Sequence, residues 1–289
     1  IFSSMTLKPG TEVGESDIVV QTTNTPYFSG SLSVDNHGSR STGYERAFLT
    51  LDVNSPFELG EKFNFMYLAT TEINYWGAGI SYPLFNDSTI ISYNYTTLDY
   101  DLGAPYGSLN GYGDSKTHSG AITRNLWRQG SFQLSGTGSY AYRTYYNFAS
   151  GSETSDKNIK AWILTLDAAF QDSFASGGIN IASLATIIGR LDLSGNPSDY
   201  SADSTTAKTN GSFEKLSASY IRIQRITDKD SLWLTLTGQY AFDNNLDSAE
   251  KMSLGGATGV RAYPTSEANG DHGLMIQAEV RHAFNPFFT

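Results

Sequence analysis

The sequence predicts an all-β fold, a transmembrane antiparallel β-barrel with about twelve strands present. Apolar and polar residues alternate at every step through long segments, as in strands whose two faces meet different surroundings. Many of these segments run to about ten residues or more, longer than the roughly five or six of a soluble strand and close to the roughly 9–11 of a tilted membrane strand. Short turns alternate with long polar connections at 101–116, 192–211 and 244–272, as they do at the two rims of such a barrel.

Clusters of Gly, Asn, Asp, Ser and Pro mark the turns and so define the strands. The predicted strands are 27–36, 43–54, 61–71, 72–82, 87–100, 117–127, 131–148, 157–173, 177–191, 212–226, 230–243 and 273–284. The connection at 192–211, rich in Ser, Thr, Asp and Asn, is predicted to be an exposed mobile loop.

Alternation is clearest in four of these segments, taken in chain order. In 43–54, alanine, leucine and valine lie opposite arginine, threonine and aspartate. In 131–148, the even positions hold aromatic residues, leucine and glycine, and the odd ones hold mainly polar residues. The segments 230–243 and 273–284 repeat the pattern with aliphatic residues at even positions. A period of two residues places each set on one face of a sheet.

Composition supports the same architecture. The 289 residues include 18 Tyr, 16 Phe and 4 Trp, enough for two aromatic girdles at membrane interfaces. Gly reaches 28 while Pro is only 8, because long paired strands exclude proline. Cysteine is absent, which avoids mispairing in an oxidising compartment. The chain also lacks the run of roughly 18 apolar residues that a spanning helix needs.

Charge and motif content exclude several function classes. A net charge of −10 without any Lys/Arg-rich run argues against a nucleic-acid partner. The four histidines, His37, His118, His272 and His282, do not have metal-ligand spacing, so no metal and no cofactor are predicted. A nucleophile elbow and a phosphate-binding loop are also missing, so the chain is not predicted to be an enzyme. Charged residues predicted to face the lumen give it an ordinary polar lining, and they are Arg46, Asp52, Arg124 and Arg143.

Two segments carry specific motifs. The first is a turn that begins Asp35-Asn36-His37-Gly38 and continues Ser39-Arg40-Ser41-Thr42-Gly43. Asn and Gly tolerate positive φ there, and the Asp and Ser side chains are suited to bonding turn amides. The second joins Leu254-Gly255-Gly256 to Gly259, to Val260-Arg261-Ala262-Tyr263, and then to Gly270-Asp271-His272-Gly273. Taken alone, Arg261 would be a solvated loop arginine, and Asp271 with its glycines would shape a return turn.

Together these segments resemble two-partner secretion (TpsB) transporters of the BamA-like POTRA-barrel superfamily. The first turn is similar to that family's D-N-x-G-S-R-x-T-G hairpin, and 260–263 to its Val-Arg-Gly-Tyr loop. Ala262 stands where the family has glycine, and an alanine side chain disfavours positive φ at that position. Residues 7–18 resemble the passage from the last periplasmic POTRA domain into the barrel, which implies that residues 1–24 end that domain and 25–289 form the barrel.

The resemblance also implies features beyond this segment of chain. Family members carry a plug helix, two POTRA domains and sixteen strands, so the sequence is expected to represent an incomplete barrel. In the family the loop arginine pairs with the aspartate of an F-x-D-x-G motif on the strand that follows the last one predicted here. Arg261 is therefore expected to fold into the lumen and pair with a wall carboxylate as a bidentate, low-dielectric anchor.

The implied function is an outer-membrane translocation pore of a Gram-negative bacterium. It would secrete one unfolded TpsA-type exoprotein (an adhesin, a haemolysin or a contact-dependent inhibition toxin), recognised through its N-terminal secretion domain, and act as a monomer surrounded by outer-membrane lipid. The loop with Arg261 would act as its gating element. Three alternatives remain open, namely a BamA-like insertase, a general diffusion porin and a soluble carbohydrate-binding β domain.

Overall fold

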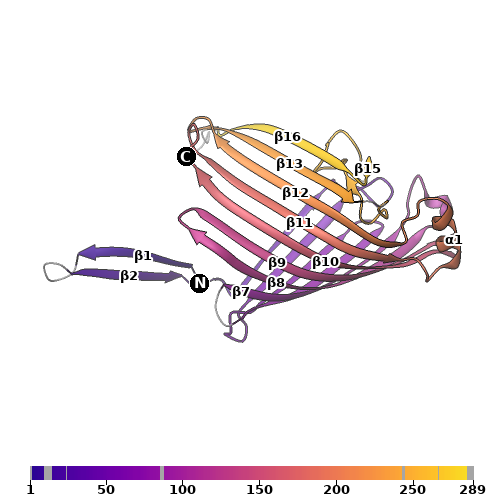
Figure 1. Cartoon of the computed structure of the whole chain (residues 1–289), viewed down its shortest axis with the longest axis horizontal. Helices are drawn as coiled ribbons and strands as arrows, with labels where there is room; N and C mark the ends of the chain where they lie inside the picture. The colour runs from indigo at the N-terminus through magenta and orange to yellow at the C-terminus, as the bar shows by residue number, and fades with distance from the viewer. Residues whose placement is uncertain are drawn as a thin grey trace.

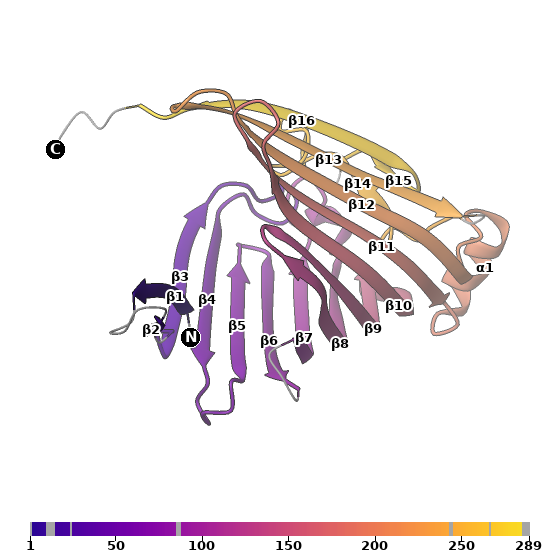
Figure 2. The same ribbon diagram turned by 60° about the vertical axis from the view of Figure 1, so that its left-hand side comes forward.

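A computed structural model describes residues 2–9, 15–23, 25–84, 88–242, 245–265 and 267–284. Its main body is one twelve-stranded antiparallel sheet in which consecutive strands pair in chain order from β3 to β13, and β16 adds to β13. Figures 1 and 2 show this sheet curving around an inner space. The strands are β3 (Phe28–Asp35), β4 (Arg46–Asn54), β5 (Lys62–Ala69), β6 (Ile73–Pro83), β7 (Thr89–Asp101), β8 (Tyr112–Gln129), β9 (Phe132–Ala149), β10 (Ser152–Asp172), β11 (Gly178–Asp192), β12 (Gly211–Arg225), β13 (Asp230–Phe242) and β16 (Gly273–His282).

The predicted strands are confirmed one for one, with two notable shifts in their bounds. β8 begins at Tyr112 and not at 117, and β10 begins at Ser152 and not at 157. The connection predicted at 101–116 is therefore shorter, and it contains only the 3₁₀ turn η1 (Gly107–Leu109). These polar ends form strands because their backbone groups pair with neighbouring strands, the start of β8 with both β7 and β9 and the start of β10 with β9.

The connection at 193–210, within the loop predicted at 192–211, contains helix α1 (Pro197–Thr205), which was not predicted from the sequence. The side chain of Asn196 caps the helix by accepting hydrogen bonds from the amides of Ser198 and Asp199, both at 3.0 Å. An Asn followed by Pro is a helix start signal that the Ser- and Asp-rich composition concealed.

The end of α1 is held by Asp203, a buried carboxylate outside the sheet. Burial opposes its ionisation, but hydrogen bonds from Thr209 and Asn210 outweigh that effect and hold the pKa of Asp203 below its ordinary value. The amides of both residues donate to it at 2.9 Å.

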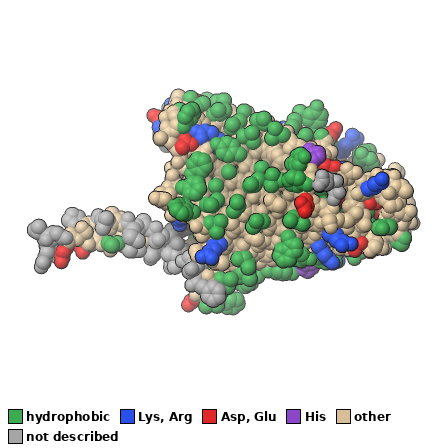
Figure 3. Space-filling model, viewed as in Figure 1, with side chains coloured by type: hydrophobic (Ala, Val, Ile, Leu, Met, Phe, Trp, Pro, Cys, Tyr) green, Lys and Arg blue, Asp and Glu red, His purple; other side chains and the backbone are tan. Residues whose placement is uncertain are grey.

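The sheet has two distinct faces. On β10, Lys157, Ile159 and Ala161 are buried on the inner face, while Trp162 and Leu164 on the other face are 67% and 61% exposed. We call this second face the outer face. Figure 3 shows hydrophobic side chains across the middle of the molecule on this side, with most charged ones toward the ends. Large exposed apolar side chains recur over most strands, which suits contact with lipid better than contact with water.

The outer face also contains Arg124. It lies opposite Gly136 in the pairing of β8 with β9, two positions from Ile122 on the same face, so its predicted place in the lumen is wrong. Within the described ranges, no helix is long and apolar enough to cross a membrane.

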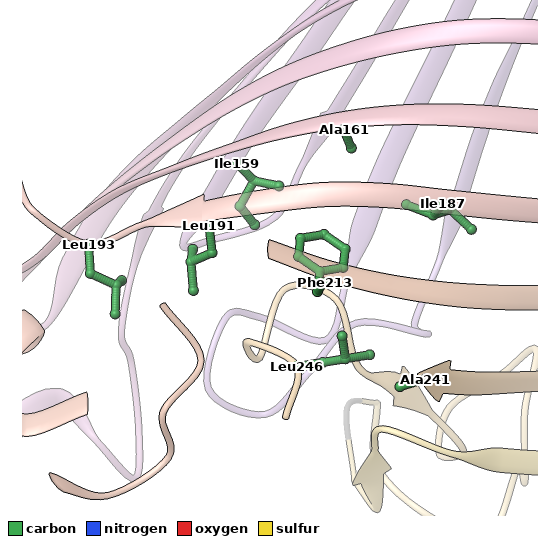
Figure 4. Packing of buried hydrophobic residues seen from close by; sticks show 8 residues of the cluster. All are labelled: Ile159, Ala161, Ile187, Leu191, Leu193, Phe213, Ala241 and Leu246. Atoms are coloured by element: carbon green, nitrogen blue, oxygen red, sulfur yellow. The ribbon is translucent and has the colours of Figure 1, made fainter. Parts of the chain in front are cut away.

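A compact hydrophobic cluster lies on the inner face (Figure 4). Its members are Ile159, Ala161, Ile187, Leu191, Leu193, Phe213, Ala241 and Leu246. The ring of Phe213 lies over Gly189, where an added Cβ would sit 2.3 Å from the ring. Leu246 belongs to the connection between β13 and β16, yet it is only 1% exposed. The cluster therefore fixes that connection against the inner face.

The first residues of the chain form a separate ribbon of β1 (Phe2–Pro9) and β2 (Ser16–Thr23), which extends away from the large sheet (Figure 1). Part of the POTRA-like passage, at 10–14, lies outside the described residues. The assignment of 1–24 to the end of a POTRA domain stays a prediction.

Candidate functional site

The connection between β13 and β16 folds back along the inner face of the sheet. We call its described residues, 245–265 and 267–272, the inner loop. It includes two short paired strands, β14 (Met252–Ser253) and β15 (Asn269–Gly270). Its base, its return and its tip contact the sheet in different ways.

Buried ion pairs hold the base of the inner loop. Lys157 on β10 donates to both carboxylate oxygens of Asp247, at 2.8 and 2.9 Å. Lys215 on β12 lies 2.8 Å from the carboxylate of Glu250, which also pairs with Arg143 on β9. Glu250 is 3% exposed, so the loss of both cations would strand its charge away from water.

Side-chain amides of the sheet bind the backbone of the same loop. Gln239 on β13 donates to the carbonyl oxygens of Glu250 and Asp271, at 3.1 and 3.2 Å. Gln277 on β16 donates to the carbonyl oxygen of Gly259 at 2.7 Å. These contacts satisfy carbonyls that a loop lying against a sheet would otherwise leave unpaired.

Asp271 closes the return of the loop. Its carboxylate accepts the amide of Leu246 at 3.2 Å and lies 3.5 Å from Lys251. The neighbouring Gly270 pairs with Met252, and an added Cβ at Gly273 would lie 2.8 Å from the sulfur of that methionine. The contacts of this segment are therefore with the loop itself and with the sheet.

The glycines of the loop motif permit a tight crossing of the backbone. The amide of Val260 donates to the carbonyl of Leu254 at 2.7 Å. An added Cβ at Gly259 would lie 2.2 Å from that carbonyl oxygen, and one at Gly255 would lie 2.1 Å from the carbonyl oxygen of Pro264. Within the described part of the loop, positive φ occurs at Gly256 (113°) and Ala268 (55°) but not at Ala262. The alanine therefore needs no strained backbone.

Arg261 meets a wall carboxylate on β16. Its guanidinium donates to Glu279 at 2.5 Å, and Glu279 also accepts from Arg281 at 3.0 Å. Arg281 in turn lies 3.7 Å from the ring centroid of Trp233. The side chain of Arg261 is 68% exposed. One guanidinium nitrogen of Arg261 therefore makes this pair at an exposed position, and the bidentate anchor expected with the aspartate of the F-x-D-x-G motif stays a prediction.

In the first hairpin turn the side chains of Asp35 and Ser39 accept backbone amides, whereas positive φ occurs at Gly43 but not at Asn36 or Gly38. Asp35 binds the guanidinium of Arg46 at 2.7 and 2.9 Å and accepts the amide of His37 at 2.9 Å. The amide of Ser41 donates to the hydroxyl of Ser39 at 3.4 Å. Gly43 has a φ of 96°.

The remaining residues of this turn make contacts of several kinds. The amide of Gly38 donates to the carbonyl of Tyr44 at 2.9 Å, and the carbonyl of Thr42 accepts from Thr70 on the next connection. Arg40 and Asn36 are exposed.

The structure brings the two sequence motifs together. A cavity of about 480 Å³ lies between the first turn and the tip of the inner loop. Asn36, His37 and Gly38 line one side of it, and Arg261 and Tyr263 are among the residues on the other. Segments more than two hundred positions apart in the chain therefore share one polar hollow next to the Arg261–Glu279 pair.

The buried anchors of the loop were not identified from sequence. Arg143 was predicted only as lumen polarity, and Lys157, Lys215, Asp247 and Glu250 were not singled out. A partial signal exists, because the two lysines occupy inner-face positions next to apolar residues of the same face, Ile159 on β10 and Phe213 on β12. Their partners lie 90 and 35 positions away, in a loop whose path sequence alone does not define.

Comparison with known proteins adds to this geometry. A family model described as haemolysin secretion/activation protein ShlB/FhaC/HecB matches residues 14–289. The heme/hemopexin transporter protein HuxB of Haemophilus influenzae is 27% identical over 302 aligned positions, covering 100% of this chain and 51% of HuxB. The outer membrane transporter CdiB of Escherichia coli is 25% identical over 288 positions, covering 95% of the chain and 47% of CdiB. The chain thus spans about half the length of the curated relatives it matches.

Solved structures show the same fold. CdiB from Escherichia coli superposes with a TM-score of 0.80 at 22% identity, over 96% of this chain and 52% of that one. BamA from Haemophilus ducreyi lacking POTRA domains 1–3 superposes with a TM-score of 0.57 at 12% identity, over 96% of this chain and 57% of BamA.

Proposed function

The chain belongs to the haemolysin secretion/activation protein family ShlB/FhaC/HecB, the TpsB transporters, and from this premise we propose that it forms the pore part of a two-partner secretion transporter in the outer membrane. The observation that carries the proposal is the inner loop, which is anchored by buried ion pairs to the inner face of a sheet whose outer face is apolar. Such a sheet divides lipid from a polar interior.

The polar interior suits a hydrated, unfolded polypeptide. Lysine, arginine, glutamine and acidic side chains line the inner face around the loop. An extended chain keeps its own backbone groups hydrated in such a lumen, whereas an apolar bore would leave them unpaired. The proposed cargo is one secreted exoprotein, and folding of that exoprotein outside the cell would supply the driving force.

We assign the chain a transport role and no catalytic one, since its family is one of secretion proteins. In this proposal the inner loop is the conformational element. Its base is fixed by buried charges, and its tip, with Arg261, rests on an exposed pair beside the first hairpin turn. Movement of the tip would widen the path along the inner face while the base stays in place.

An export assay tests the proposal. The full-length protein is expressed with and without the large exoprotein encoded beside it, and that exoprotein is quantified in the medium and in the periplasm. Exoprotein is expected in the medium only when the barrel is present. Periplasmic retention in both cases, with the barrel assembled in the outer membrane, would instead favour an insertase or a porin.

A further inference from the structure

The outer face contains a hollow of about 560 Å³ that runs across β6 to β10. Its walls are mainly apolar, with both aliphatic and aromatic side chains, and include Ile80, Tyr82, Tyr93, Ile122, Tyr140 and Trp162. Gly120 and Gly138, on the adjacent strands β8 and β9, form part of its floor. We call this hollow the outer groove.

The glycines in the floor leave space that a side chain would fill. An added Cβ at Gly138 would meet nothing within 4 Å, and one at Gly120 only the carbonyl oxygen of Ser92 at 4.0 Å. Backbone crowding therefore does not require glycine here. A glycine within a strand weakens the strand, and it recurs where another molecule approaches the backbone closely.

Two cations lie next to the outer groove on the same face. Lys160 is two positions along β10 from Trp162, and Arg190 is two positions along β11 from Ile188, the residue that pairs with Trp162. Lys160 and Arg190 are both exposed, and they are direct cross-strand partners. Like charges placed directly opposite each other in a sheet repel, so this pair favours an anion that bridges both.

Two acidic residues lie near these cations on the same face, Asp192 two positions along β11 from Arg190 and Glu214 on β12 opposite Ile188. Among the described residues, neither cation forms an ion pair within 4 Å; Lys160 lies 5.8 Å from the ring centroid of Tyr142, and Arg190 acts at longer range on Asp192. Both lie on the side of the groove nearer the longer connections, which in outer-membrane barrels are extracellular. An anion at this position would belong to the outer leaflet.

We propose that the outer groove and the Lys160–Arg190 pair bind a phosphate-bearing, multiply acylated lipid of the outer leaflet. The phosphate lies between the two cations, and an acyl chain lies in the groove over Gly120 and Gly138. The inference rests on the proposed function insofar as that function places the sheet in the outer membrane. It adds a lipid site that transport itself does not require.

Lipid binding to the purified full-length protein tests the inference, with diphosphoryl lipid A as the probe and phosphatidylethanolamine as the zwitterionic comparison. Lys160→Gln with Arg190→Gln is expected to weaken lipid A binding roughly fivefold per cation, about 25-fold together. Gly138→Leu fills the groove without a backbone clash and is expected to reduce binding as well. Native mass spectrometry reports the bound lipid directly.

Two matched variants act as controls. Ala218→Leu places a leucine, as Gly138→Leu does, on the outer face of β12 and away from the groove. Arg124→Gln removes an outer-face cation near the end of β8 that lies farther from Lys160 and Arg190. Neither should change lipid A binding. The proposal is wrong if the double variant and Gly138→Leu bind lipid A like the unaltered protein. It is also wrong if Arg124→Gln alone weakens binding and phosphatidylethanolamine binds equally well, because the lipid would then belong to the inner leaflet.

Membrane fractionation and export of the exoprotein, measured on the same variants, separate the two proposals. If the double variant and Gly138→Leu bind lipid A as the unaltered protein does, reach the outer membrane and export the exoprotein, only the proposed lipid site is overturned. Assembly of the unaltered protein in the outer membrane without export overturns the proposed function, and lipid A binding that depends on Lys160 and Arg190 would still support the groove.

Discussion

Replacement of Glu250 by glutamine is expected to release the base of the inner loop while the sheet stays folded. The carboxylate is 3% exposed and faces Lys215 at 2.8 Å and Arg143. Glutamine keeps the volume and removes the charge, so two cations lose their counter-ion. Breaking a buried pair in this way costs about 3–5 kcal/mol, which raises the open fraction of the loop by roughly two orders of magnitude or more.

Limited trypsin digestion of the detergent-solubilised protein measures this release, because Lys251 follows the mutated position directly. The half-exposed Lys251 is expected to be cut much faster in Glu250→Gln. Glu267→Gln is the matched control, since Glu267 is an exposed glutamate of the same loop. Adding Lys215→Met to Glu250→Gln should restore part of the protection, because it removes the more buried stranded cation and leaves Arg143, which reaches water. Equal cutting of Glu250→Gln and Glu267→Gln would refute the idea that buried charge holds the loop.

Two further predictions concern the tip of the loop and α1. Arg261→Ala is expected to leave the barrel assembled, because its pair with Glu279 is exposed to solvent and adds little stability, yet to lower export sharply. Normal secretion by this variant would contradict a gating role. The amides of segment 203–210 are expected to stay protected from hydrogen exchange between pH 7 and 5 and to lose that protection as the pH falls below about 4. The pKa of Asp203 is lowered by folding, so its carboxylate stabilises the fold above its unfolded pKa and loses that contribution on protonation. Hydrogen–deuterium exchange corrected for intrinsic rates measures this loss, and unchanged protection at pH 3 would argue against Asp203 as the lock.

The strands were predictable because their signal is local. A period of two residues is visible in any ten-residue window, so the segment 230–243 shows its two faces without knowledge of its neighbours. The ends of β8 and β10 were not predictable in the same way. Residues 112–116 and 152–156 are polar enough to be taken for loops. They form strands because the first segment pairs with β7 and β9 and the second pairs with β9. Tertiary pairing overrides local composition there.

The site was predictable only in part, because its motifs have local signals and its long-range contacts do not. The motif at 260–263 and the turn at 35–43 stood out through their glycines and their resemblance to one family. That they line one cavity depends on the curvature of the sheet and on the path of the inner loop. The pairing of Lys215 with Glu250 has no local signature, since a lysine at an inner-face position is consistent with ordinary lumen polarity until its partner is placed.

The inner loop is held unequally along its length, and this bears on how it would move. Its base is fixed by ion pairs whose members are nearly buried, whereas its tip is held by the exposed Arg261–Glu279 contact and by one hydrogen bond from Gln277. Gly256, with a φ of 113°, lies between the two parts at a backbone angle that other residues rarely adopt. Thermal motion or a passing polypeptide would therefore displace the tip first, with Gly256 as the hinge. Arg261 then makes a contact that can break and re-form as the tip moves. Lys157, Lys215 and Arg143, which no sequence motif marks, hold the base of the loop against the inner face of the sheet.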